Sequence, residues 1–179
     1  MNIPMFELYA NYNLRMNKQI YTAARKLKNE EYNKNMGAFF GSINHTLNHI
    51  AVGDIFWLKR FGEHEELFQS LEPIRQLSLP QSLETILFYD LKGLFHLRKL
   101  IDRCIVSFVQ ELTELDINSN LTYTNSKGVE SNKHFCLVLM HMFNHQTHHR
   151  GQVSTLFSQL GVDVGVTDMI VDVPEIDVI

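Results

Sequence analysis

The chain has little of what marks several common classes of protein. Its 179 residues contain two cysteines, Cys104 and Cys136, far apart and among apolar neighbours, so we expect buried thiols without a disulfide. The longest apolar run, Phe135 to Met140, is much shorter than the roughly 20 residues of a membrane span. Glu7 interrupts any leader pattern. We therefore expect a cytoplasmic protein with no membrane partner.

Basic charge and several catalytic motifs are also scarce. The 16 lysines and arginines against 20 acidic residues give a net charge of −4, which argues against a nucleic-acid partner. The sequence has no glycine-rich phosphate loop and no Gly-x-Ser-x-Gly motif. Because it also lacks a Glu-x-x-His triplet, the ligand pattern of di-iron carboxylate bundles is excluded. Apolar residues make up 45%, as in an ordinary soluble protein, and the length fits one domain, residues 1–179.

What the sequence does contain is helical periodicity. Apolar residues recur at steps of three and four over residues 4–28, 38–61, 81–115 and 131–161, which predicts four long helices. A connection of about 20 residues between the second and third segments can cross the length of a bundle. Residues 121–128 read as a short β-hairpin or a structured turn between the third and fourth helices. The fold class is therefore all-α.

Individual residues set the expected boundaries of these helices. Ser78 and Gln81 read as a capping box that opens the third helix, with Leu83 among its first apolar positions. Ser131 is expected to cap the fourth helix, and Gly161 to end it. The second helix has two apolar stripes, which predicts neighbours on both sides, such as bundle partners and a second subunit. The acidic last 18 residues are expected to form an extended cover.

Four of the nine histidines, His141, His145, His148 and His149, lie within nine residues of the fourth helix. His145 and His149 are four residues apart on the inward stripe and can reach one ion together. His141 continues this series, whereas His148 points about 100° away from it. Since buried imidazoles without partners are costly, a shared divalent ion would satisfy them together. The pattern therefore predicts a metal site.

The third ligand is left open by the spacing. On the second helix His45 and His49 are also four residues apart, and either could complete a three-histidine site. Gln146 stands where a zinc-protease helix carries its general-base glutamate, so that class of enzyme is excluded. Histidines elsewhere are isolated, and for these we expect solvent-facing or core-filling positions: His64, His96 and His134.

The longer motifs resemble a known family. Asn144-His-Gln-Thr-His-His-Arg-Gly-Gln152, followed by Gly161 and Val166-Thr-Asp168, is similar to the C-terminal signature of the DinB family, a group of DinB/YfiT-like metalloenzymes. Residues 39–61, from Phe39-Phe-Gly-Ser-Ile-Asn-His to Trp57-Leu-Lys-Arg-Phe61, resemble its second-helix signature. Tyr12-Asn13 and the Thr122-Tyr123 to Gly128 turn match as well. The resemblance spans nearly the whole chain.

This resemblance implies a four-helix bundle with up-down-down-up connectivity that forms a homodimer. It also implies that three histidines bind a divalent metal, and by motif position these are His49, His145 and His149. Arg15 departs from the pattern, because the family often has tryptophan there, and Phe56 stands where a polar residue is common.

A three-histidine site leaves coordination positions open for water or substrate. Zinc or nickel is the expected metal, with iron or manganese as alternatives, since all four accept imidazole. The expected function is that of a metal-dependent hydrolase or a thiol-dependent transferase acting on a small-molecule substrate. A non-catalytic metal-binding stress protein and a structural dimeric bundle are the alternatives. Around the ligands, Asp54, His148 and Arg150 are candidate supporting residues, and Asp168 is expected to fold the tail over the site.

Overall fold

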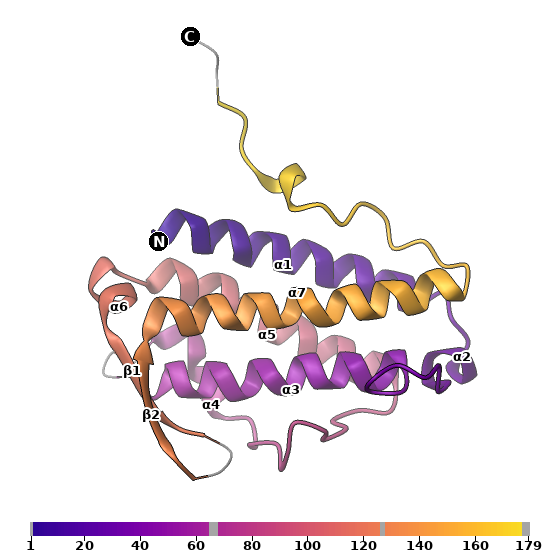
Figure 1. Ribbon diagram of the computed structural model, residues 1–179, viewed down its shortest axis with the longest axis horizontal. Coiled ribbons are helices and arrows are strands. Elements are labelled where there is room, and N and C mark those ends of the chain that lie inside the picture. Colours follow the sequence, from indigo (N-terminus) through magenta and orange to yellow (C-terminus); the bar gives the residue numbers. More distant parts are fainter. Residues whose placement is uncertain (1, 65–67, 126–127, 177–179) are drawn as a thin grey trace.

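The computed structural model describes residues 2–64, 68–125 and 128–176. This part of the chain is mostly helical, with seven α-helices, two short 3-10 helices and one two-stranded sheet. The four long helices lie side by side in Figure 1. They are α1 (Ile3–Ala24), α3 (Ile43–Gly62), α5 (Leu91–Glu111) and α7 (Phe135–Gln159).

The apolar stripes of the long helices meet in one core. α1 packs against α5 and α7, and α3 packs against α7 and α5. Figure 1 shows α1 and α7 running one way along the long axis and α3 and α5 running the other way. Shorter elements connect them: α2 (Asn29–Asn33), a 3-10 turn (Gln69–Leu71), α4 (Glu72–Arg75) and α6 (Glu114–Asn118).

The second long helix begins later than the sequence pattern predicts. α3 starts at Ile43 and not at Ala38, because the Ser42 hydroxyl accepts a hydrogen bond from the His45 N–H and caps it. The segment before it turns at Gly37 and Gly41, whose φ angles of 73° and 78° suit glycine. Phe40 therefore lies in the loop before α3, where its ring stacks on His49.

The predicted start of the third helix is wrong. Residues 78–90 are irregular in the structure, so Ser78 and Gln81 do not form a capping box and Leu83 is not a core position. α5 starts instead at Leu91, capped by Asp90, whose carboxylate accepts from the Gly93 N–H. Its far end also comes earlier than predicted. A short helix, α6, follows it, and Leu115, the last residue of the predicted third helix, is exposed there.

The structure contains the predicted hairpin, but its second strand lies later than predicted and the hairpin follows α6 directly. β1 (Asn120–Thr124) pairs antiparallel with β2 (Glu130–His134), and residues 126 and 127 of the predicted turn lie outside the described residues. Ser131 does not cap the fourth helix, because it sits in β2 opposite Tyr123. α7 begins at Phe135 and ends just before Gly161, whose φ of 69° fits the predicted helix stop.

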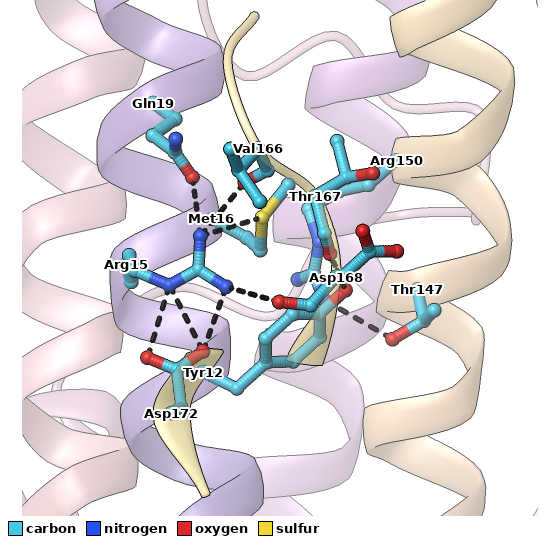
Figure 2. A network of polar contacts seen from close by, with 10 residues as sticks. All are labelled: Tyr12, Arg15, Met16, Gln19, Thr147, Arg150, Val166, Thr167, Asp168 and Asp172. Carbon is cyan, nitrogen blue, oxygen red and sulfur yellow. Dashed lines mark hydrogen bonds and ion pairs between the residues drawn. The ribbon is translucent and has the colours of Figure 1, made fainter. Parts of the chain in front are cut away.

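The described part of the tail is extended apart from one 3-10 turn, Met169–Asp172, as the sequence predicts. Arg15 of α1 holds it (Figure 2). The Arg15 guanidinium binds the Asp172 carboxylate, at 2.7 Å for the closest pair, and donates to the Val166 and Asp168 carbonyls, at 2.9 Å each. The tail therefore lies against α1.

Two smaller expectations concern the cysteines and membranes. Cys104 and Cys136 are both free thiols; Cys104 is buried and Cys136 is half-buried. Among the described residues, no helix is both long and apolar enough to cross a membrane.

Candidate metal centre

Three histidine side chains converge between α3 and α7. The Nε2 atom of His49 lies 3.0 Å from the His145 Nε2 and 3.2 Å from the His149 Nε2. One ligand nitrogen from each ring lies within 4.8 Å of the others. Zinc–nitrogen bonds of about 2.0–2.1 Å place tetrahedral ligands roughly 3.3 Å apart. The three nitrogens are thus spaced as the ligands of one ion would be.

The phases of two helices bring these residues together. His145 and His149 are one turn apart on the face of α7 that packs against α3. His49 is buried at that interface, whereas His45, one turn earlier on α3, is exposed to solvent. Of the two histidines that the spacing left open on the second helix, the structure brings His49 into the cluster.

The outer nitrogens of two rings are held by hydrogen bonds. His49 Nδ1 lies 2.9 Å from the Leu83 carbonyl, and His149 Nδ1 lies 2.8 Å from the Gln152 side-chain oxygen. An Nδ1–H that donates to these oxygens leaves the Nε2 lone pair facing the cluster. The buried His145 Nδ1 has no hydrogen-bond partner among the described residues. Two of the three rings are therefore fixed in the tautomer that binds a metal through Nε2.

Burial keeps the three imidazoles uncharged. Desolvation lowers the pKa of His49 and of His149 below the usual 6.5. It lowers the pKa of His145 furthest, to about 3, and the neighbouring histidines add to this effect. Because neutral imidazole is the form that binds a metal, the cluster is ready to accept an ion at neutral pH.

Two residues that the sequence did not point to shape the cluster closely. A Cβ atom at Gly53 would lie 2.8 Å from the His145 Cε1, so a side chain there would push the ring aside. The Phe40 ring stacks on His49 with centroids 4.0 Å apart and meets His149 edge-on at 5.4 Å. A glycine in the middle of a helix was the available signal for the first contact.

Asparagine side chains hold the loop that supplies the Leu83 carbonyl. The Asn48 oxygen accepts from the Leu87 and Phe88 N–H groups at 2.8 and 3.1 Å, and its amide donates to the Phe88 carbonyl at 2.9 Å. Asn44, one turn earlier, donates to the Tyr89 carbonyl at 3.2 Å. Both asparagines are fully buried, so these bonds offset the cost of burying the amides. Two asparagines at core-facing positions of the sequence could have indicated that a loop is bound there.

Asp54, a candidate supporting residue, takes part in a different set of contacts. Its carboxylate pairs with Arg98 of α5, which also pairs with Asp102 at 2.9 Å. All three side chains are buried. Desolvation raises the pKa of Asp54 to about 6, against the opposing effect of Arg98. Asp54 therefore belongs to a buried charged network that joins α3 to α5.

Arg150 lies in the same interior and reaches α1. Its guanidinium donates to the side-chain oxygens of Asn13 and of Gln146, the latter at 3.1 Å, and to the Thr147 hydroxyl at 3.1 Å. Burial lowers the pKa of Arg150 to about 10. Its ring neighbour is Tyr12, whose hydroxyl donates to the Thr167 carbonyl of the tail at 3.0 Å. The contacts of Arg150 thus tie α7 to α1.

The other histidines are placed around the cluster or away from it. His148 is exposed and reaches it through Gln152, whose amide nitrogen lies 3.3 Å from the His148 Nε2. His141 is exposed and packs edge-on against Trp57. The isolated histidines lie as expected: His96 and His134 are exposed, and His64 is half-buried against Phe135 with Ser119 as its hydrogen-bond partner.

Comparison with known proteins places this chain in a family. A relative, Protein DinB from Bacillus subtilis (strain 168), is 29% identical over 163 residues, which cover 91% of this chain and 90% of the relative. The sequence model of the DinB family matches residues 1–174, a span that includes all three clustered histidines. The chain therefore belongs to the DinB family.

Proposed function

We propose that the protein binds a divalent metal ion through the Nε2 atoms of His49, His145 and His149. The observation that carries this proposal is the convergence of the three nitrogens, two of them at 3.0 and 3.2 Å from the third. Oxygen acceptors on the far side of His49 and His149 support it further. Zinc or nickel suits an all-imidazole set best, and iron or manganese would also bind there.

The ligand set favours catalysis over simple storage. The cluster found among the described residues contains neither carboxylate nor thiolate, so the protein would not neutralise the charge of the ion. When bound, a divalent ion with open positions lowers the pKa of water or a thiol and supplies a nucleophile. We infer a metal-dependent hydrolase or a thiol-dependent transferase that acts on a small molecule.

Metal analysis of untagged protein tests the site. We expect close to one ion per chain, and a loss of at least about 10-fold in affinity for His49→Ala, His145→Ala or His149→Ala. The matched controls are His45→Ala and His148→Ala, which remove exposed imidazoles on the same helices and should change the affinity little.

Two results would contradict this assignment. One is metal content below about 0.2 ion per chain that added zinc, nickel or manganese does not restore, since a three-histidine site binds such ions tightly. The other is loss of metal in His148→Ala without loss in His149→Ala.

Turnover needs its own measurement. Esters, amides and electrophiles should be offered to the metal-loaded protein, with and without low-molecular-weight thiols, and activity should disappear in His145→Ala. Dependence on a thiol would identify the transferase, and its absence the hydrolase. A fully loaded protein that is inactive in every assay would instead be a metal-binding protein without catalysis.

We further infer that the four long helices form a four-helix bundle with up-down-down-up connectivity. Their contacts and directions support this arrangement (Figure 1). A homodimer stays a prediction. The two apolar stripes of α3 do not require a second subunit, because both faces of this helix have neighbours within the chain. Light scattering would measure the oligomeric state. A cytoplasmic location is proposed from the two free thiols, which suit a reducing compartment.

A further inference from the structure

An open pocket lies beside the candidate metal centre, between α3, the hairpin and the first turns of α7. Its volume is about 530 Å³, within the range of pockets that bind small molecules. Residues from four elements line it, including Trp57 of α3, Tyr123 of β1, Lys133 of β2 and His141 of α7. None of these residues belongs to the histidine cluster.

The walls of the pocket are aromatic. The Trp57 ring meets Tyr123 with centroids 5.4 Å apart and His141 with centroids 5.3 Å apart, and both pairs are edge-on. Leu137, 47% exposed, adds an apolar surface that water covers in the free protein. Flat aromatic ligands stack well in such surroundings and cover apolar area at the same time. The shape and lining therefore suit an aromatic ring.

The charge of the pocket is positive. Lys133, an exposed residue, lines the pocket, and the Arg60 guanidinium lies 4.5 Å from the Trp57 ring centroid and 4.7 Å from that of Tyr123. The described lining residues include no carboxylate. Burial lowers the pKa of Arg60, and Glu63, whose charge opposes this effect, does not line the pocket. An anionic group on the ligand would thus be attracted and not repelled.

The pocket begins one helical turn from the clustered histidines. His141 and His145 are successive residues on one face of α7, with ring centroids 6.2 Å apart. On α3, Trp57 follows one turn after Gly53, the residue in contact with His145. A turn of helix is about 5.4 Å long, so a ligand in the pocket can reach the centre with a short linker.

We propose that this pocket binds the non-reacting part of the substrate and that this part is an aromatic ring bearing a carboxylate. The ring lies against Trp57 and His141, and the carboxylate faces Lys133. The ligand is called a substrate because this inference rests on the proposed function. Binding of the ligand to the pocket requires neither metal nor turnover. It narrows the substrate class to aryl carboxylates whose reactive group extends toward His145.

Fluorescence offers a direct test, because Trp57 is the single tryptophan of the chain. The probes are benzoate and its uncharged amide, benzamide, titrated into metal-free and metal-loaded protein. Both should change the Trp57 emission, and the carboxylate should bind about 5-fold more tightly, as expected for one exposed ion pair of up to about 1 kcal/mol. Lys133→Gln should remove this preference while binding of the amide stays the same. Lys92→Gln, which removes an exposed lysine of α5, should keep it.

Three results would overturn the proposal: equal binding of the two probes, a preference that survives Lys133→Gln, or a preference seen only with metal bound. The last would mean that the carboxylate binds the ion. Failure of the metal site is recognised separately, from metal content, because the pocket can be titrated in protein without metal.

Discussion

At the scale of single residues, the cluster depends on how closely α3 approaches α7. Gly53 makes this approach possible, since even a methyl group there would overlap the His145 ring. Gly151 is a second mid-helix glycine, on α7, but it faces open space. Substitutions at the two positions therefore distinguish two effects: the low helix propensity of glycine, which both share, and the positioning of a ligand, which belongs to Gly53 alone.

We expect Gly53→Ala to displace His145 and to lower metal affinity by about 10-fold or more, as for other changes that misplace ligands. Isothermal titration with zinc measures this effect. In Gly151→Ala metal affinity should stay the same, and the free energy of unfolding should rise by up to about 1 kcal/mol through helix propensity. Unchanged zinc binding in Gly53→Ala would show that the contact is not required.

The histidines show what the sequence can and cannot predict at this scale. Spacing placed His145 and His149 on one face because a helix repeats every 3.6 residues. It could not choose between His45 and His49, since both have the same spacing and only the packing of α3 on α7 distinguishes them. The family motif favoured His49, the residue that lies in the cluster. The contacts of Phe40 with His49 and His149 could not be predicted, because they depend on the loop before α3.

At the scale of elements, helical periodicity predicted the four long helices, but their ends depend on tertiary contacts. The third helix starts ten residues later than expected because buried Asn48 binds the backbone of Leu87 and Phe88 and keeps that segment irregular. No local pattern contains this information, since the partners are about 40 residues apart. The tail shows the same dependence: its extended form was predictable from composition, and its attachment through Arg15 was not.

Removal of the Arg15 guanidinium should release the tail. In Arg15→Gln, we expect thermolysin to cut within residues 166–172 about 5- to 10-fold faster, because charge-assisted hydrogen bonds of about 1 to 2 kcal/mol are lost. Mass spectrometry of timed digests measures the rate. Metal affinity should not change, and Lys18→Gln, on the exposed side of α1, serves as the control. Equal cleavage of Arg15→Gln and the unmodified protein would contradict the anchor.

At the scale of the whole molecule, the interior contains charge as well as apolar side chains. Asp54, Arg98 and Asp102 are buried together between α3 and α5, and Arg150 lies among polar side chains of α1 and α7. Removal of one member would leave an opposite charge buried without its partner, which usually costs about 3 to 5 kcal/mol. All four long helices thus share one polar interior beside the histidine cluster.

This network gives stability a distinctive pH dependence. The pKa of Asp54 is about 6 in the folded chain, against the ordinary value of 3.8 expected in the unfolded chain. The folded state therefore holds the proton more tightly. Stability from this group is therefore complete below about pH 4 and is lost as the pH rises through about 6. Relative to Asp54→Asn, the unmodified protein should lose up to about 3 kcal/mol of unfolding free energy between pH 4 and 7.

Urea unfolding at a series of pH values measures this difference. Glu7→Gln, at an exposed position, is the control and should follow the unmodified protein throughout. A difference between the unmodified protein and Asp54→Asn that stays constant with pH, or that changes in the opposite direction, would mean that Arg98 keeps Asp54 ionised.

The positions of the ligands along the chain also determine when the site can form. His49 and His149 are separated by 100 positions, and α7 is the last long helix to leave the ribosome. A nascent chain that ends before His145 lacks both α7 ligands and the Gln152 oxygen that fixes His149. Acquisition of metal is consequently a late step of biogenesis, reached only by chains whose synthesis has passed α7.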